Sequence, residues 1–196
     1  MIYQLIKEAL FFLIIINPVS KIVIVSMLSK QYKHMEIEKL LVKSSIIALI
    51  MLVIFAFAGE IILKDLFHIS TNALMIAGGI VLSFMGFTAL NKGVFFQAQN
   101  SQSLMDLAIV PLASPLIAGP ATITATIVKA ATLTPYFVAV SVIIAVLINL
   151  VIVSFSLSIS EFLNKYNLTG ALIRITGLFI LAMGVDMALK GIKSYF

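Results

Sequence analysis

The chain has 196 residues, of which 62% are hydrophobic and only 11% are charged. A water-soluble domain carries about 25% charged residues because its surface must face water, so this composition excludes a soluble fold and predicts a protein that is solvated by lipid. The formal charge of +5 does not indicate a nucleic-acid-binding protein, because most of the 13 Lys and Arg residues lie at the ends of apolar runs. The sequence contains no cysteine, which excludes disulfide bonds and cysteine nucleophiles.

A membrane-spanning helix needs about 20 mostly apolar residues, and several segments of the sequence meet that requirement. In chain order they are residues 4–29, 42–63, 70–91, 107–129, 135–159 and 168–189. Polar side chains at 30–39 predict a solvated loop between the first two spans, and those at 97–106 predict another loop near the midpoint of the chain. No small-residue cleavage site follows the first apolar run, so we expect it to be retained as a helix rather than removed as a signal peptide.

Matching residues in the two halves of the chain indicate an internal repeat. A shift of 98 residues places the third span on the sixth and aligns Gly79 with Gly177 and Gly86 with Gly184. The two glycines of each span are seven residues apart, so they form a smooth strip along which another helix can pack closely. Each half has three spans, and an odd number places the second half in the membrane in the opposite orientation. The predicted all-α fold therefore consists of two inverted three-helix repeats, residues 1–96 and 107–196, joined by the loop at 97–106.

Proline interrupts the first and fourth predicted spans near their centres. The first contains Asn17-Pro18-Val19-Ser20, and the fourth contains Ala118-Gly119-Pro120-Ala121-Thr122. Proline removes a helical hydrogen bond and clashes with the preceding turn, and in a bilayer the freed backbone groups persist only where protein or a water-filled cavity surrounds them. Interruptions at matching places indicate a transporter's substrate site near the membrane midplane; simple proline kinks in the two helices are the alternative.

We therefore predict the substrate site at these two interruptions. Backbone N–H groups at the start of a half-helix would bind an anionic group, and free carbonyls at the end of one would bind a cation, so an amino acid zwitterion could use both. The predicted binding residues are Asn17, Pro18, Val19, Ser20, Ala118, Gly119, Pro120, Ala121, Thr122 and Thr124. The sequence has no metal-ligand spacing, and no cofactor is expected.

These motifs resemble the MarC family of integral membrane proteins, which includes small neutral amino acid transporters of the SnatA type. The resemblance is carried by Asn17-Pro18-Val19-Ser20, by Gly78-Gly79 with Gly86, and most specifically by the run from Pro111 to Ile123 (PLASPLIAGPATI). It implies a six-helix protein of the plasma (inner) membrane that transports amino acids such as glycine and alanine in a proton-dependent manner. Ser20 and Ala121 stand where family members often have glycine, which makes these two side chains slightly larger.

Lys21 follows the first interruption, well inside the span, and two placements are open for it. Its stem could extend to the membrane surface, or the ammonium could face the interior and pair with Asp106, Glu60 or Asp186. Asp186 precedes Lys190 by four residues, which favours a surface ion pair within one helix.

Other functions and partners follow from the remaining polar residues. Asn149 lies within the fifth span, and we expect its side chain to form an interhelical hydrogen bond rather than to contact the substrate. An intramembrane enzyme would need a dyad such as Ser20–Lys21, but adjacent helical residues point in different directions, so we expect no enzymatic activity. A channel or an exporter of another small solute is the alternative, because half-helices also line pores.

The positive charges of the loops predict that both termini lie outside. The expected partners are the substrate, protons and membrane lipid, and we expect no nucleic acid.

Overall fold

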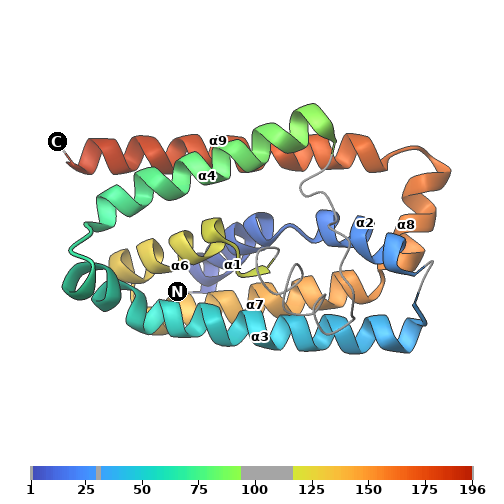
Figure 1. The fold of residues 1–196 in the computed structure, drawn as a ribbon, viewed down its shortest axis with the longest axis horizontal. Coiled ribbons are helices and arrows are strands. Elements are labelled where there is room, and N and C mark those ends of the chain that lie inside the picture. The colour runs from blue at the N-terminus through green and yellow to red at the C-terminus, as the bar shows by residue number, and fades with distance from the viewer. Residues whose placement is uncertain (1, 30–31, 94–116, 196) are drawn as a thin grey trace.

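The computed structural model describes residues 2–29, 32–93 and 117–195, which form helices joined by short turns. The helices are α1 (Ile2–Ile16), α2 (Pro18–Leu28), α3 (His34–Ile61), the π-helical turn η1 (Ile62–Leu66), α4 (Thr71–Lys92), α6 (Pro120–Thr132), α7 (Pro135–Ser154), α8 (Ser156–Lys165) and α9 (Thr169–Tyr195). Within these described residues, the helical segments long and apolar enough to cross a membrane are Ile2–Ser26, His34–Leu66, Thr71–Lys92, Pro135–Ser154 and Thr169–Tyr195. Most of the helices run along the long axis of the molecule (Figure 1).

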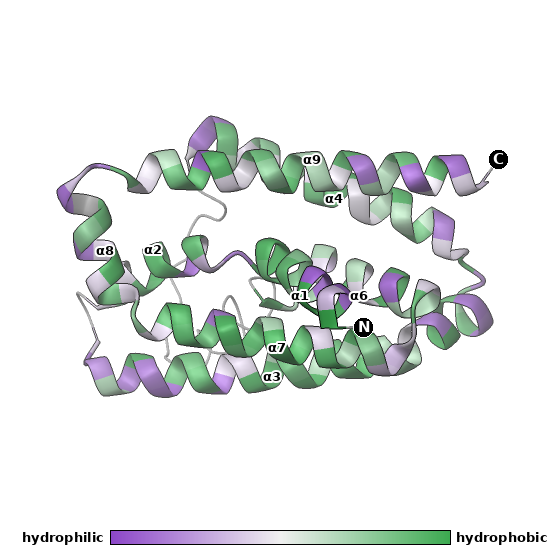
Figure 2. Ribbon diagram, turned by 180° about the vertical axis from the view of Figure 1, so that it is seen from behind, coloured by the Kyte–Doolittle hydropathy of each residue, from purple (hydrophilic) through white to green (hydrophobic). Residues whose placement is uncertain are grey.

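The outer surface of the bundle is apolar. On α3, for example, Ile46, Ile50 and Ile54 lie one turn apart and are 52%, 55% and 53% exposed. Figure 2 shows hydrophobic residues along most of the length of the helices and hydrophilic residues gathered toward their ends, with a hydrophilic exception at the junction of α1 and α2. Soluble monomeric proteins rarely expose apolar surfaces this large. The outward faces of these helices therefore lie against lipid hydrocarbon.

Helices α4 and α9 pack backbone against backbone in an antiparallel pair (Figure 1). A Cβ atom added to Gly184 would lie 2.7 Å from the carbonyl oxygen of Gly79, and one added to Gly86 would lie 2.6 Å from the carbonyl oxygen of Gly177. Real Cβ atoms do not approach other atoms so closely, so these four positions require glycine. The glycine strips predicted from the sequence are therefore confirmed as close-packing surfaces, and they face each other.

Helix α6 lies between α3 and α4 and is fitted to them by two further glycines. The side chain of Ile127 occupies the space beside Gly59 of α3, and the methyl carbon of Thr124 occupies the space beside Gly78 of α4. The buried core runs through the same region and includes Ala121 and Ala125 of α6. Small residues on both sides thus let α6 approach the two longer helices closely.

Several predicted segment boundaries were wrong, and the last span continues past the predicted residue 189 to Tyr195. The loop expected at 30–39 is helical from His34 onward, because the carboxylate of Glu36 accepts a hydrogen bond of 2.9 Å from the backbone N–H of Lys33 and so satisfies a free donor at the start of α3. The fifth span, expected to reach residue 159, ends at Ser154. The chain turns there and α8 packs on α2, where Ser160 Oγ bonds Ser26 Oγ at 2.8 Å.

Candidate functional site

The first interruption joins two helices through a single residue. Helix α1 ends at Ile16, α2 begins at Pro18, and Asn17 between them has a φ of 56°. This left-handed conformation is adopted by asparagine more readily than by most other non-glycine residues. Proline has no N–H and a φ fixed near the helical value, so it suits the first position of a helix. The Asn-Pro pair therefore ends one helix and starts the next with no intervening loop.

Asn17 and Ser20 hold this junction together. Asn17 Oδ1 accepts the backbone N–H of Ser20 at 3.4 Å, and Ser20 Oγ donates to the Asn17 carbonyl at 2.8 Å. Both residues are buried, and Asn17 is only 3% exposed. Its remaining polar atom, Nδ2, has no hydrogen-bond partner within the described residues. An unpaired buried donor costs about 1–3 kcal/mol, so this amide needs a partner such as an ordered water or a ligand.

Lys21 is buried at the same junction, with 1% of its surface exposed. Its ammonium group turns back along the chain and donates to the carbonyl oxygens of Ile16 and Asn17, the second at 3.4 Å. These carbonyls belong to the end of α1, where no later turn of the helix supplies donors. The interior placement predicted as one alternative for Lys21 is confirmed, and extension to the membrane surface is wrong.

The acidic residues proposed as partners of Lys21 lie elsewhere or are not described. Glu60 pairs with Lys64 at 2.5 Å. Asp186 pairs with Lys190 at 2.6 Å, which confirms the predicted ion pair within α9. Asp106 lies outside the described residues. Among the described residues, then, no carboxylate lies within ion-pair distance of the Lys21 ammonium.

The second interruption places the start of α6 inside the protein. Gly119 is the extended residue before the helix and supplies no side-chain cap, and Pro120 is the first helical residue. The first N–H groups of α6, on Ala121 and Thr122, have no acceptor within the helix, because the first bond of the helix runs from the Ile123 N–H to the Gly119 carbonyl at 2.9 Å. A buried helix start of this kind carries partial positive charge and attracts anions.

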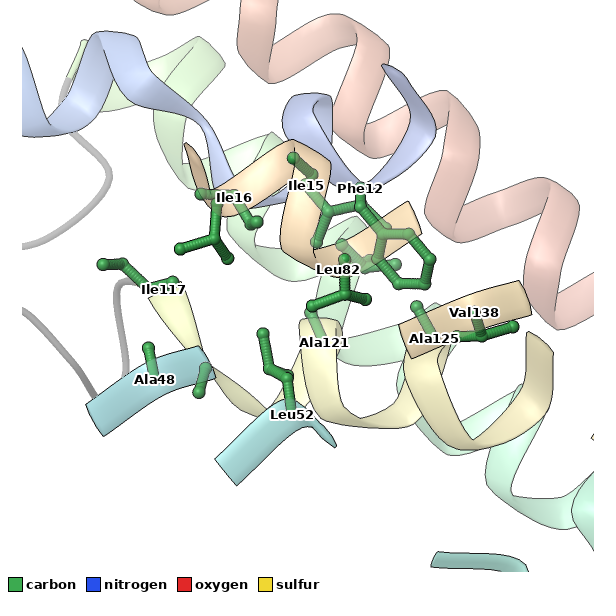
Figure 3. Close-up of a cluster of buried hydrophobic side chains, with 14 of the residues drawn as sticks. Phe12, Ile15, Ile16, Ala48, Leu52, Leu82, Ile117, Ala121, Ala125 and Val138 are labelled. Atoms are coloured by element: carbon green, nitrogen blue, oxygen red, sulfur yellow. The ribbon is translucent and has the colours of Figure 1, made fainter. Parts of the chain in front are cut away.

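One buried core brings the residues beside the two interruptions together. Ile16, directly before the first, and Ile117 and Ala118, directly before the second, belong to the same cluster of buried side chains. Figure 3 shows Ile16 of α1 near Ile117 in this view, with Ala121 of α6 nearer to Leu82 of α4. The two parts of the predicted site therefore share one core, whereas residues 107–116 of the predicted fourth span lie outside the described residues.

The other predicted binding residues occupy varied positions around this core. Pro18 and Val19 are half-buried, and Val19 packs against the core cluster. Pro120 is exposed. Thr122 is buried, and its carbonyl accepts the Thr126 hydroxyl at 2.7 Å. Thr124 packs its methyl carbon against Gly78 of α4, so it is the member of the predicted set that is most engaged in helix packing.

Sequence analysis did not single out Glu8, which forms an ion pair with Lys129 between α1 and α6. The pair is 2.7 Å long, the Glu8 side chain is 7% exposed, and the Lys129 ammonium lies 4.6 Å from the centre of the Phe11 ring. The signal available in the sequence was a carboxylate close to the start of an apolar span, where charge is costly. A cavity of about 390 Å³ opens beside this pair between α1, α4, α6 and α9, and its lining includes Lys7, Lys129 and Lys190.

Asn149 of α7 was predicted to form an interhelical hydrogen bond. It is 1% exposed, and its Oδ1 atom has no partner within the described part of the chain. The predicted interhelical hydrogen bond of Asn149 therefore stays a prediction.

Apolar helices that are long enough to span a bilayer, with polar groups buried at an internal helix junction, define an integral membrane protein. Residues 2–196 match the family model described as MarC family integral membrane protein. The chain belongs to this family, as its motifs suggested.

Relatives cover nearly the whole chain and are described as UPF0056 membrane proteins. One from Pyrococcus horikoshii is 38% identical over 191 residues, which are 97% of this chain and 94% of the relative. One from Methanocaldococcus jannaschii is 33% identical and covers 91% of both chains, and one from Bacillus subtilis is 30% identical over 92% of this chain and 90% of the relative. No solved structure matches the chain.

Proposed function

We propose that this protein is a secondary transporter of small neutral amino acids such as glycine and alanine. The observation that carries the proposal is a pair of helix starts in the middle of the molecule: α2 begins directly after the buried residue Asn17, and α6 begins directly after the buried residue Gly119. From this central region the two helices run toward opposite ends of the bundle (Figure 1). Such half-helix ends at the midplane are the arrangement with which transporters bind small charged groups.

The chemistry of the site favours a small zwitterion. The N–H groups of Ala121 and Thr122 and the unpaired Nδ2 of Asn17 are donors for a carboxylate. Ser20 and Ala121, two further residues of the proposed site, have small side chains, which favours a substrate with a short side chain. The predicted residues 17–20, 118–122 and 124 remain the proposed site. We propose protons as the coupling ion and no enzymatic reaction.

The fold supports two inverted repeats, residues 1–96 and 107–196. Lys7, near the start of α1, and Lys190, near the end of α9, line one cavity, so the two ends of the chain lie on the same side, as an even number of spans requires. We propose that residues 107–129 form the fourth of six spans, as the sequence predicts, and that both termini lie outside the plasma membrane.

The glycine contacts between α4 and α9 also support the repeat. Gly79 meets Gly184 and Gly177 meets Gly86, and a shift of 98 residues converts the first pair into the second. This reciprocity is the contact pattern that a two-fold axis produces. It therefore agrees with an axis that relates the two halves of the chain.

Uptake of labelled glycine and alanine into sealed liposomes, with and without an inward proton gradient, tests the proposal. Asn17→Gly preserves the left-handed backbone but removes the amide, so we expect uptake to fall by roughly tenfold to a hundredfold, the effect of losing a hydrogen bond to a charged group. Asn167→Gly is the matched control, because Asn167 also has a positive φ, 53°, but is exposed. Gly119→Leu should abolish uptake, because the leucine side chain would occupy the space at the start of α6 where we propose that the substrate binds.

Three results would correct the proposal. Uptake that survives both Asn17→Gly and Gly119→Leu would remove the substrate from the two interruptions. Uptake without saturation or counterflow would identify a channel. No uptake of either amino acid by folded protein in sealed vesicles would reject the proposed substrate.

A further inference from the structure

We infer that Lys21 is a resident positive charge of the substrate site, and that the site therefore recognises a substrate by its carboxylate rather than by its amine. This inference rests on the proposed function, because it concerns the same site at the junction of α1 and α2. It changes the chemistry expected from helix ends alone, which offer carbonyls to a cation as well as N–H groups to an anion.

The position of the Lys21 ammonium is the first observation that supports this inference. It donates to the carbonyl oxygens of Ile16 and Asn17, the groups at the end of α1 that would otherwise bind a cation. A substrate's amine, or a coupling metal cation, would need the same oxygens. The protein's own ammonium already occupies the cation position at this helix end.

The second observation is the lack of a counter-charge. Lys21 is 1% exposed, and no described carboxylate lies within ion-pair distance of its ammonium. An isolated ammonium inside a membrane span costs about 2.5–3.5 kcal/mol on insertion scales, and such groups mark functional sites. A carboxylate from the substrate is the ligand that would offset this cost when it binds.

The third observation is that the neighbouring groups are also donors. Nδ2 of Asn17, at the start of α2, is buried without a partner. The start of α6 adds N–H groups on Ala121 and Thr122 with no acceptor in the helix. Two helix starts, an amide nitrogen and an ammonium together make a site that is rich in donors and positive in potential.

Competition experiments on the wild-type protein test this inference directly. Propionate and lactate, which lack the amine, should compete with labelled alanine, whereas alaninamide and ethylamine, which lack the carboxylate, should not. The same four compounds are tested for thermal stabilisation of purified protein, a measurement that does not depend on transport. Equal competition by amines and carboxylates would overturn the inference while leaving the transporter proposal intact.

Lys21→Met provides the second test, since methionine is unbranched like lysine but uncharged. We expect the KM for alanine to rise by roughly tenfold to a hundredfold, as for the loss of a hydrogen bond to a charged group, and stabilisation by propionate to disappear. Lys7→Met, an exposed position on α1, is the matched control and should change neither. Lys21→Arg keeps the charge and should retain part of the propionate effect.

Asp106, the acidic side chain that lies outside the described residues, supplies the decisive comparison. Asp106→Asn should leave propionate competition unchanged, and a loss equal to that of Lys21→Met would show that Asp106 neutralises Lys21 and would overturn the inference. If purified protein transports no amino acid but is stabilised by propionate in a Lys21-dependent way, the proposed function fails and the carboxylate site stands. If propionate neither competes nor stabilises the folded wild type, the inference fails.

Discussion

Replacement of Glu8 by alanine is expected to lower the free energy of unfolding by about 3 kcal/mol, the lower end of the range for breaking a buried ion pair by removing one partner. The reason is that Lys129 would keep its charge beside the ring of Phe11 without the carboxylate that lies 2.7 Å away in the native protein. The Lys129 side chain is 28% exposed, which limits the loss. Thermal unfolding in detergent would show a decrease of about 6–12 °C in Tm for a chain of this size.

An exposed ion pair provides the control for this prediction. Glu60→Ala removes a carboxylate from a pair of 2.5 Å whose side chains are 52% and 39% exposed, and such pairs contribute at most about 1 kcal/mol. The double variant Glu8→Leu with Lys129→Leu removes both charges and should recover most of the stability lost on removing Glu8 alone. A Glu8→Ala protein as stable as Glu60→Ala would show that the pair does not join α1 to α6.

Substitution of Gly184 by alanine is expected to destabilise the protein by about 1–3 kcal/mol, the cost of overpacking a tightly packed interface. The new Cβ would lie 2.5 Å from the backbone nitrogen of Ser83 and 2.7 Å from the carbonyl oxygen of Gly79, and neither backbone atom can move without displacing α4. Gly184→Leu should prevent assembly of α4 with α9. Circular dichroism during heating measures the first effect, and the yield of monodisperse protein measures the second.

Gly170 is the matched control on the same helix. A Cβ atom added there has no neighbour within 4 Å, so Gly170→Ala should leave stability unchanged or raise it by up to about 1 kcal/mol through the better helix propensity of alanine. Equal Tm values for Gly184→Ala and Gly170→Ala would mean that α4 and α9 do not touch at Gly184 in the membrane.

Hydropathy alone predicted the helical class and most of the spans, because lipid selects for long apolar helices regardless of tertiary detail. It failed at His34, where a polar, amphipathic start to α3 has no apolar signal. It also failed at Ser154, where packing of α8 on α2 ends a helix within a run free of charged residues. In both places the boundary depends on hydrogen bonds that involve side chains, which a count of apolar residues does not detect.

The junction at Asn17 and the start of α6 at Pro120 were predictable because proline within an apolar run has few structural outcomes. The direction of Lys21 was not predictable, since a flexible four-carbon stem can reach either the surface or the interior. The partnership of Glu8 with Lys129 depends on two helices from different halves of the chain meeting in space. Local pattern locates helix breaks, whereas tertiary contact decides which charged groups surround them.

The contact between α4 and α9 also determines which parts of the protein are free to move during a transport cycle. Because Gly86 lies against the backbone of α9 and Gly184 lies against the backbone of α4, the two helices have little room to slide past each other at these positions. We therefore expect α4 and α9 to keep the same position relative to each other. For the transport that we propose, we expect α1, α2 and α6 to move against this pair, so distances between spin labels on α4 and α9 should stay constant while those from α6 to α9 change.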